Sequence, residues 1–134
     1  MKKIILFFLI ALIVNAAEIS FEKNLKIPKL LEKRVTLYWK YRADKLFEKT
    51  YSYELPYLNY LHTKLWYEKF FRNAPKFSKI RVKKVGKCDK TSCILGILLI
   101  PKFSPDDPIF IYDKWIKIDK MWYHKYDDKP LPTF

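Results

Sequence analysis

The spacing of apolar residues changes near Pro75, and this change constrains the fold more than any other feature of the sequence. Between Pro28 and Asn73, apolar side chains recur at helical spacing, which is typical of amphipathic helices. From Lys79 onward they alternate with charged residues or form continuous runs, as they do in β-strands. The sequence therefore predicts helices followed by strands within one α+β domain.

Prolines mark the limits of the predicted helices. Pro28 suits the first turn of a helix that breaks at 43–45 and is followed by a shorter helix through 47–51. Pro56 begins a further helical segment that ends before Pro75, because a residue before proline is displaced from helical angles. Its apolar stripe is predicted to carry Leu58, Leu61, Leu65 and Phe70. Strands are predicted over 79–84, 93–100, 109–118 and 121–126.

A two-residue turn at 119–120 sets the pairing of the last predicted hairpin. It places Ile118 opposite Met121 and Trp115 opposite His124. Asp113 and His124 are then diagonal neighbours about 7–8 Å apart at the backbone, so their side chains can meet. One face of the hairpin carries Asp113, Trp115, Lys117, Trp122, His124 and Tyr126.

This hairpin face supplies most of the candidate functional residues. An imidazole oriented by a carboxylate can move a proton near neutral pH, and neighbouring tryptophans can line an apolar pocket. The candidates for catalysis are His124, Asp113 and Tyr126. The candidates for a ligand pocket are Trp115, Trp122 and His62. The alternative interpretation is that these aromatic side chains stabilise the sheet and the polar ones lie at its rim.

Residues 1–17 have the layout of a secretory signal peptide. Lys2 and Lys3 are followed by an unbroken apolar run over 4–14 and then by small residues suited to signal peptidase. The run is shorter than the roughly 20 residues that span a bilayer, although an uncleaved anchor is the alternative. The sequence predicts a signal peptide over 1–16, a single domain over 17–134, and a periplasmic or secreted location.

Cys88 and Cys93 are the two cysteines of the chain. In an exported protein they are expected to form a disulfide across a short turn. Their spacing fits neither haem attachment nor a thioredoxin-type redox pair, and the sequence holds no second cysteine pair or histidine cluster for zinc. We therefore predict a structural disulfide, no metal and no cofactor.

The formal net charge is +13, and such an excess attracts lipid head groups, acidic envelope polymers or nucleic acid. The lysines are spread through helical and strand segments alike, so a solvated basic surface is the alternative to a dedicated anion site. We expect no specific nucleic-acid partner. The sequence contains no phosphate-binding loop, serine nucleophile elbow or HExxH motif.

The closing stretch DKWIKIDKMWYHKYDD, residues 113–128, resembles the final hairpin of small nuclear transport factor 2-like (cystatin-like α+β) domains of bacterial exported proteins. In that family a Trp-x-x-x-Asp-Gly-x-Trp-Tyr pattern closes a curved sheet. Lys120 stands where the family has glycine. The residues that match the pattern are Trp115, Asp119, Trp122 and Tyr123.

The resemblance implies N-terminal helices packed in the concave face of a curved antiparallel sheet, forming a cone with a pocket. The same scaffold hosts isomerases, cyclases and dehydratases as well as many proteins that only bind ligands or partners, so the fold does not assign an activity.

We predict an exported, non-enzymatic module that binds a small apolar ligand or a protein partner, with a homodimer formed through the sheet as one arrangement. The first alternative is an enzyme for proton transfer or dehydration on a small organic substrate, with His124 as base and Asp113 orienting it. The second alternative is an electrostatic binder of an anionic envelope polymer or lipid.

Overall fold

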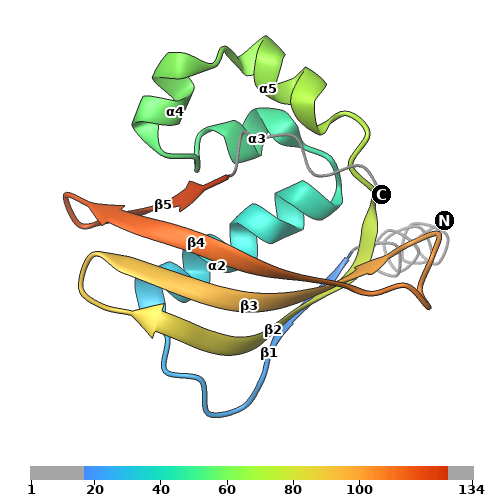
Figure 1. Cartoon of the computed structure of the whole chain (residues 1–134), viewed down its shortest axis with the longest axis horizontal. Helices are drawn as coiled ribbons and strands as arrows, with labels where there is room; N and C mark the ends of the chain where they lie inside the picture. Colours follow the sequence, from blue (N-terminus) through green and yellow to red (C-terminus); the bar gives the residue numbers. More distant parts are fainter. Residues whose placement is uncertain (1–16, 127–134) are drawn as a thin grey trace, which may run out of the picture.

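The computed structural model describes residues 17–126. The expected signal peptide and the last eight residues of the chain, 127–134, lie outside the described residues. The described chain forms an α+β fold in which the helices precede every strand except the first, as the change of spacing predicts (Figure 1). The elements in chain order are β1 (Glu18–Phe21), α2 (Lys29–Ala43), α3 (Phe47–Tyr51), α4 (Pro56–Leu61), α5 (Lys64–Phe71), β2 (Phe77–Cys88), β3 (Ser92–Pro101), β4 (Ile109–Ile118) and β5 (Met121–Lys125).

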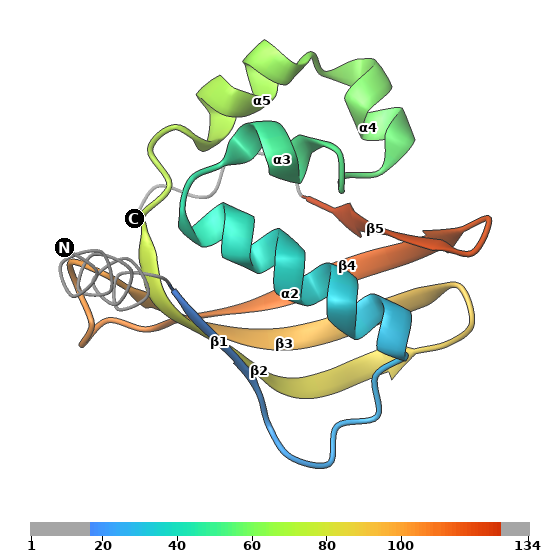
Figure 2. The same cartoon turned by 180° about the vertical axis from the view of Figure 1, so that it is seen from behind.

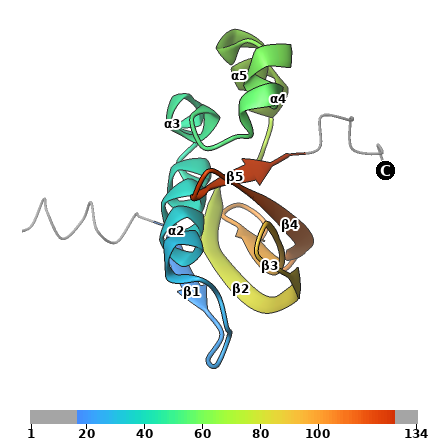
Figure 3. The same ribbon diagram turned by 90° about the vertical axis from the view of Figure 1, so that its left-hand side faces the viewer.

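The strands form one sheet in the order β1-β2-β3-β4-β5. β2 to β5 pair antiparallel with their neighbours, whereas β1 is added parallel to β2 at the edge. The sheet curls strongly, and α2 lies along its concave side (Figures 2 and 3). The expected fold class, helices in the hollow of a curved sheet, is confirmed.

α2 is held in place by burial of one face against the sheet. No side chain caps its first turn, so tertiary packing rather than capping stabilises it. Each aliphatic side chain fully removed from water contributes about 1.5–3 kcal/mol. The buried residues of the helix recur at helical spacing and are Leu31, Val35, Tyr38, Trp39 and Ala43. The strand residues in the same cluster include Ile80, Val82, Leu95, Ile97 and Trp115.

A second apolar cluster lies at one end of the sheet, beneath α3, α4 and α5 (Figure 2). Tyr126, which directly follows β5, packs into it with ring centroids 5.6 Å from Tyr67 and 5.7 Å from Phe71. Residues 17–126 therefore form two apolar clusters, and the end of the last hairpin reaches the second. The buried members of this second cluster are Phe47, Leu55, Leu58, Tyr67, Phe71 and Tyr126.

The helical segment expected to run unbroken from Pro56 is divided into two helices. His62 is extended, with φ −127° and ψ 128°, and ends α4. Thr63 begins α5, because its hydroxyl accepts a hydrogen bond from the backbone N–H of Trp66 at 3.1 Å. The break turns α5, so Leu61 and Leu65 are 61% and 60% exposed and the predicted apolar stripe is wrong at both positions.

The last hairpin has the predicted register. Ile118 lies opposite Met121 and Trp115 lies opposite His124. Asp119 and Lys120 form the turn with φ of 47° and 68°, the left-handed angles that a type I′ turn requires. The twist of this turn matches the twist of the strands, which favours this turn type in a hairpin. Here two residues other than glycine adopt it.

β3 is apolar on both faces, which suggests a strand covered on both sides. In the structure, α2 covers the inner face of β3. None of the described helices covers its outer face, because they lie on the concave side and at one end of the sheet (Figure 3). Cross-strand partners share a face, so the register defines an outer sheet face. Its members are Lys79, Arg81, Lys84, Leu98, Ile100, Phe110, Tyr112 and Lys114.

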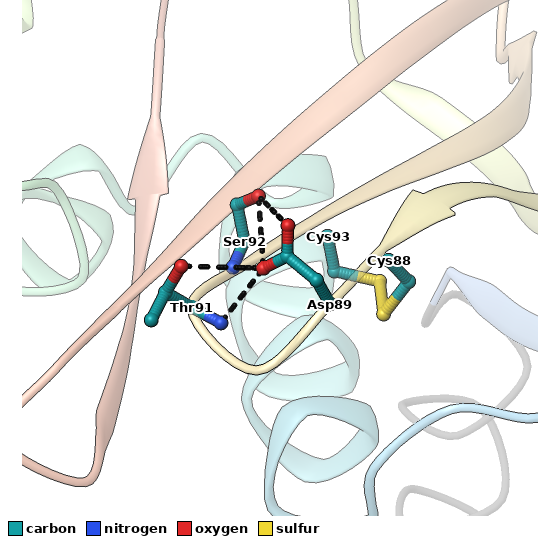
Figure 4. Close-up of a disulfide and its surroundings, with 5 residues drawn as sticks. All are labelled: Cys88, Asp89, Thr91, Ser92 and Cys93. Carbon is teal, nitrogen blue, oxygen red and sulfur yellow. Dashed lines mark hydrogen bonds between the residues drawn. A yellow bond between two sulfur atoms is a disulfide. The ribbon is translucent and has the colours of Figure 1, made fainter.

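Cys88 and Cys93 form a disulfide across the turn between β2 and β3, as predicted (Figure 4). Within this turn, the carboxylate of Asp89 accepts hydrogen bonds from the backbone N–H groups of Thr91 and Ser92 at 2.8 and 2.9 Å. These two bonds lower the pKa of Asp89. The disulfide and the carboxylate therefore fix the same tight turn.

Replacing both cysteines with serine is expected to lower the free energy of unfolding by about 2 kcal/mol, because the disulfide closes only a short loop. Urea unfolding of the two proteins measures the difference. The far-UV circular dichroism spectrum should stay unchanged, since Cys93 is the single cysteine among the buried members of the cluster beside α2, and the cluster of α3–α5 contains neither cysteine. A variant that fails to fold would contradict this prediction.

Candidate functional site

Three ionisable side chains meet in the interior of the protein. Nε2 of His124 lies 2.6 Å from Oδ1 of Asp113, and Nδ1 of His124 lies 2.9 Å from Oε2 of Glu54. The exposed fractions of Glu54, Asp113 and His124 are 1%, 3% and 6%. The contact predicted between Asp113 and His124 is present, and Glu54 adds a second carboxylate on the other side of the ring. We call these three residues the buried charge cluster.

The carboxylates of the buried charge cluster have further hydrogen-bond donors. Oδ2 of Asp113 accepts from the indole N–H groups of Trp39 at 2.9 Å and Trp115 at 2.8 Å. Oε1 of Glu54 accepts from the hydroxyl of Tyr67 at 3.1 Å. Tyr67 is itself 2.9 Å from the hydroxyl of Thr50. These donors come from α2, α3, α5 and β4, so the cluster ties four elements together.

Backbone hydrogen bonds place Glu54 beside the imidazole. The segment between α3 and α4 runs parallel to β5 and makes a bridge between Glu54 and His124. The N–H of Leu55 donates to the carbonyl of His124 at 2.9 Å, and the N–H of His124 donates to the carbonyl of Tyr53 at 2.8 Å. The carboxylate of Glu54 is therefore held by its backbone as well as by its partners.

The two carboxylates keep His124 protonated. Burial alone would lower the pKa of His124, but the negative charges of Glu54 and Asp113 outweigh it and raise the pKa to about 9. Tyr38 stacks on the imidazole with ring centroids 4.2 Å apart. Nη1 of Arg42 donates to the hydroxyl of Tyr38 at 3.2 Å and places a second cation near the cluster.

The buried charge cluster is built as an internal support. Both ring nitrogens of His124 are engaged, and each carboxylate has a partner besides the histidine. Aromatic rings from α2 and β4 pack against the imidazole, so a substrate would have to displace part of the core to reach it. A protonated, doubly paired imidazole is also a poor base at neutral pH.

A pocket of about 260 Å³ lies between the first half of α2 and the turn that joins β4 to β5. Leu30 and Leu37 of α2 face Met121 and Trp122 of β5 across it, and Tyr53 contributes an aromatic wall. Its polar residues are all cationic. The complete lining consists of Leu30, Lys33, Arg34, Leu37, Tyr53, Lys120, Met121 and Trp122.

The structure separates the residues that the sequence analysis grouped as a ligand pocket. Trp122 lines the pocket described above, whereas Trp115 is fully buried beneath α2. His62 lies between α4 and α5 and stacks on Trp66 with centroids 3.6 Å apart. Tyr126, a candidate for catalysis, belongs to the second apolar cluster and not to the buried charge cluster.

Glu54 and Arg34 are the important residues that sequence reasoning did not identify. Glu54 is the single acidic residue in a tyrosine- and leucine-rich stretch just before Pro56, which was the available signal for a buried carboxylate. Arg34 sits among other basic residues of α2 and has no local feature that distinguishes it. Its role depends on contacts with Tyr53 and Trp122, which are distant in the sequence.

Within residues 17–126, no group of three or more His, Cys, Asp or Glu side chains is arranged to hold a metal ion. None of the described helices combines the length and the hydropathy that a transmembrane span needs.

Comparison with known proteins shows no matching family model and no matching curated protein. Among solved structures, the chain is similar to a Campylobacter jejuni protein provisionally named an NTF2-like transpeptidase, with 11% identity and a TM-score of 0.49 over 72% of this chain and 97% of that one. It is also similar to a SEC-C motif containing protein from Rhodopseudomonas palustris, with 14% identity and a TM-score of 0.49 over 72% of this chain and 73% of that one.

The raised pKa of His124 predicts a pH-dependent stability. The pKa of His124 in the folded protein, about 9, exceeds the ordinary histidine pKa of 6.5, so its contribution to stability is complete below pH 6.5 and is lost as the pH rises through 9. Such a shift corresponds to about 3 kcal/mol. Urea unfolding between pH 6 and 9.5 should show this loss in the natural protein.

The matched variants for this test are His124→Gln and His62→Gln. His124→Gln leaves two buried carboxylates uncompensated and should lower the free energy of unfolding by about 3–5 kcal/mol at pH 6. His62→Gln should keep the pH dependence of the natural protein. A natural-like pH profile in His124→Gln would show that the buried charge cluster does not produce the effect.

Proposed function

We propose that this chain is an exported, non-enzymatic domain that binds a small molecule with a substantial apolar part in the pocket between α2 and the β4–β5 turn. The observation that carries the proposal is the apolar wall built by Leu30, Leu37, Met121 and Trp122 around a volume of about 260 Å³. Binding pockets for small molecules are concave, mostly apolar and provided with a few polar groups. This pocket has each of these properties.

The walls of the pocket belong to elements that are firmly held. Leu37 precedes the buried pair Tyr38 and Trp39 in α2, and Trp122 is 2% exposed. Leu30 and Met121 at the mouth are 63% and 43% exposed, so they can close over a ligand and lose contact with water. Burial of their exposed apolar surface would contribute about 25 cal/mol per Å² to binding.

The enzymatic alternative depends on the buried charge cluster, and its geometry favours a structural role. A catalytic His124 requires a substrate beside the imidazole, where Tyr38 and Trp115 are packed. For an enzyme, His124→Gln would abolish turnover while changing stability little. A large loss of stability, which the burial of His124 between two carboxylates leads us to expect, would instead support a structural role for the cluster.

The neutral fluorophore N-phenyl-1-naphthylamine is expected to bind in the pocket and to increase its fluorescence. Leu30→Trp fills the mouth and should weaken binding by about tenfold or more, since a blocked site loses most of the apolar contact. Leu65→Trp on α5 is the matched control, because Leu65 is 60% exposed and does not line the pocket. Equal binding by the two variants would refute this location of the site.

The outer sheet face favours a second candidate function, binding to an anionic lipid surface. Phe110 and Tyr112 are 45% and 66% exposed, and the ammonium group of Lys84 lies 5.4 Å from both ring centroids. Lys79 and Lys114 lie on the same face. Aromatic side chains that enter the interface and lysines that attract anionic head groups together suit such a surface.

This second candidate predicts binding to vesicles that contain phosphatidylglycerol but not to vesicles of phosphatidylcholine alone. The double variant Lys84→Gln, Lys114→Gln should bind more weakly, by about 1 kcal/mol per lysine. The charge-matched control is Lys40→Gln, Lys69→Gln, which changes exposed lysines on α2 and α5. Vesicle binding that is insensitive to salt, or equally weakened in both double variants, would remove this candidate.

A further inference from the structure

Every charged side chain that lines the pocket is positive. Lys33 and Arg34 lie on α2, and Lys120 lies at the tip of the hairpin opposite them. None of the lining residues is acidic. The rest of the lining is apolar or aromatic, so the pocket combines apolar walls with cationic groups.

Arg34 is the most strongly held of these cations. Its Nε donates to the carbonyl of Trp122 at 2.9 Å, and its guanidinium carbon lies 4.1 Å from the ring centroid of Tyr53 and 5.7 Å from that of Tyr123. These contacts orient the guanidinium, so little side-chain entropy remains to be lost when a ligand binds.

The orientation of Arg34 uses only part of its hydrogen-bonding capacity. An arginine side chain has five N–H donors, and the bond to Trp122 uses the one on Nε. Among residues 17–126, no carboxylate forms an ion pair with Arg34. Partial burial lowers the pKa of Arg34, but an arginine still remains protonated at neutral pH. The pocket therefore contains a preorganised positive charge without a negative partner.

We infer that this pocket takes a small amphipathic anion, an apolar chain or ring that ends in one carboxylate or phosphate group, with Arg34 as the residue that binds the anionic group. The inference rests on the proposed function, because it assigns a ligand class to the same pocket. Carboxylate and phosphate groups each present two acceptor oxygens that a guanidinium can bind through two parallel hydrogen bonds.

The two parts of such a ligand match the two parts of the pocket. Its apolar part would contact Leu30, Leu37 and Met121. Its anionic group would pair with the half-buried guanidinium, where charge-assisted hydrogen bonds are less weakened by water than at the surface. Lys33 and Lys120 are exposed, so they attract the anion from solution but contribute little to its bound state. A neutral ligand would leave Arg34 without a counterion, and a cationic ligand would be repelled.

The experiment measures the affinity of the complete domain for octanoate, octyl phosphate and 1-octanol by isothermal titration calorimetry. The alkyl chain has eight carbons in octyl phosphate and 1-octanol and seven in octanoate, so the shorter chain weakens octanoate and cannot produce a preference for it. Octyl phosphate and 1-octanol differ in the terminal group alone. We expect both anions to bind about tenfold more tightly than the alcohol, because one charge-assisted hydrogen bond accounts for a difference in affinity of this size. The relative affinities of octanoate and octyl phosphate then show whether the pocket prefers the carboxylate or the phosphate source.

Arg34→Gln should reduce the preference for the anions to about twofold or less, whereas Lys33→Gln should keep most of it. If Arg34→Gln does not fold, Arg34→Lys replaces it in the test, because it keeps the positive charge. Its preference for the anions over the alcohol should lie between those of the natural protein and Arg34→Gln. The ratio of octanoate to octanol affinity in the natural protein tests the inference without any variant.

The outcomes separate the two proposals. Binding of none of the three probes would overturn the proposed function together with this inference. Binding of 1-octanol as tightly as octyl phosphate, which has the same alkyl chain, would overturn only the inference and leave an apolar-ligand module. A preference for anions that survives in Arg34→Gln and disappears in Lys33→Gln would overturn the role of Arg34.

Discussion

The ion pairs of His124 with Glu54 and Asp113 hold together parts of the chain that have separate apolar clusters. Asp113 belongs to the sheet that packs on α2, whereas Glu54 belongs to the segment that leads into α4 and the second cluster. A protonated imidazole between two carboxylates leaves the trio with a single negative charge, which indole and phenol donors stabilise. Removing one member would leave an uncompensated charge in the interior, so the cluster behaves as a unit.

β5 connects this buried support to the candidate binding site. His124 points into the charge cluster, and two residues earlier Trp122 lines the pocket and accepts a hydrogen bond from Arg34. Because both residues lie on the inner face of one short strand, the position of α2 over β5 determines both sites. The pocket wall formed by Trp122 is buried on the same strand that the charge cluster holds, which favours a preformed site over one that is made by the ligand.

Local patterns in the sequence predicted the structural features that depend on residues close together in the chain. The period of apolar residues predicted α2 and the strands β2 to β5 but not the parallel edge strand β1. A two-residue turn predicted the hairpin register that brings Asp113 and His124 together. Glu54 was missed because its partner lies 70 positions away along the chain, beyond the reach of any periodicity. Trp115 and Trp122 share a face in the sequence pattern and both are buried, but the pocket lining includes Trp122 and not Trp115, so tertiary packing decides which of them lines a pocket. The signal peptide and exported location stay predictions.

Lys120 illustrates how one position can serve two opposing requirements. Its φ of 68° suits glycine, and a side chain with a Cβ pays roughly 1–2 kcal/mol for the left-handed conformation. Glycine at the hairpin tip would relax the backbone and remove the ammonium group from the pocket border. The tip with the least strained backbone and the tip that keeps a positive charge beside the pocket therefore differ at a single residue, and this chain carries the second.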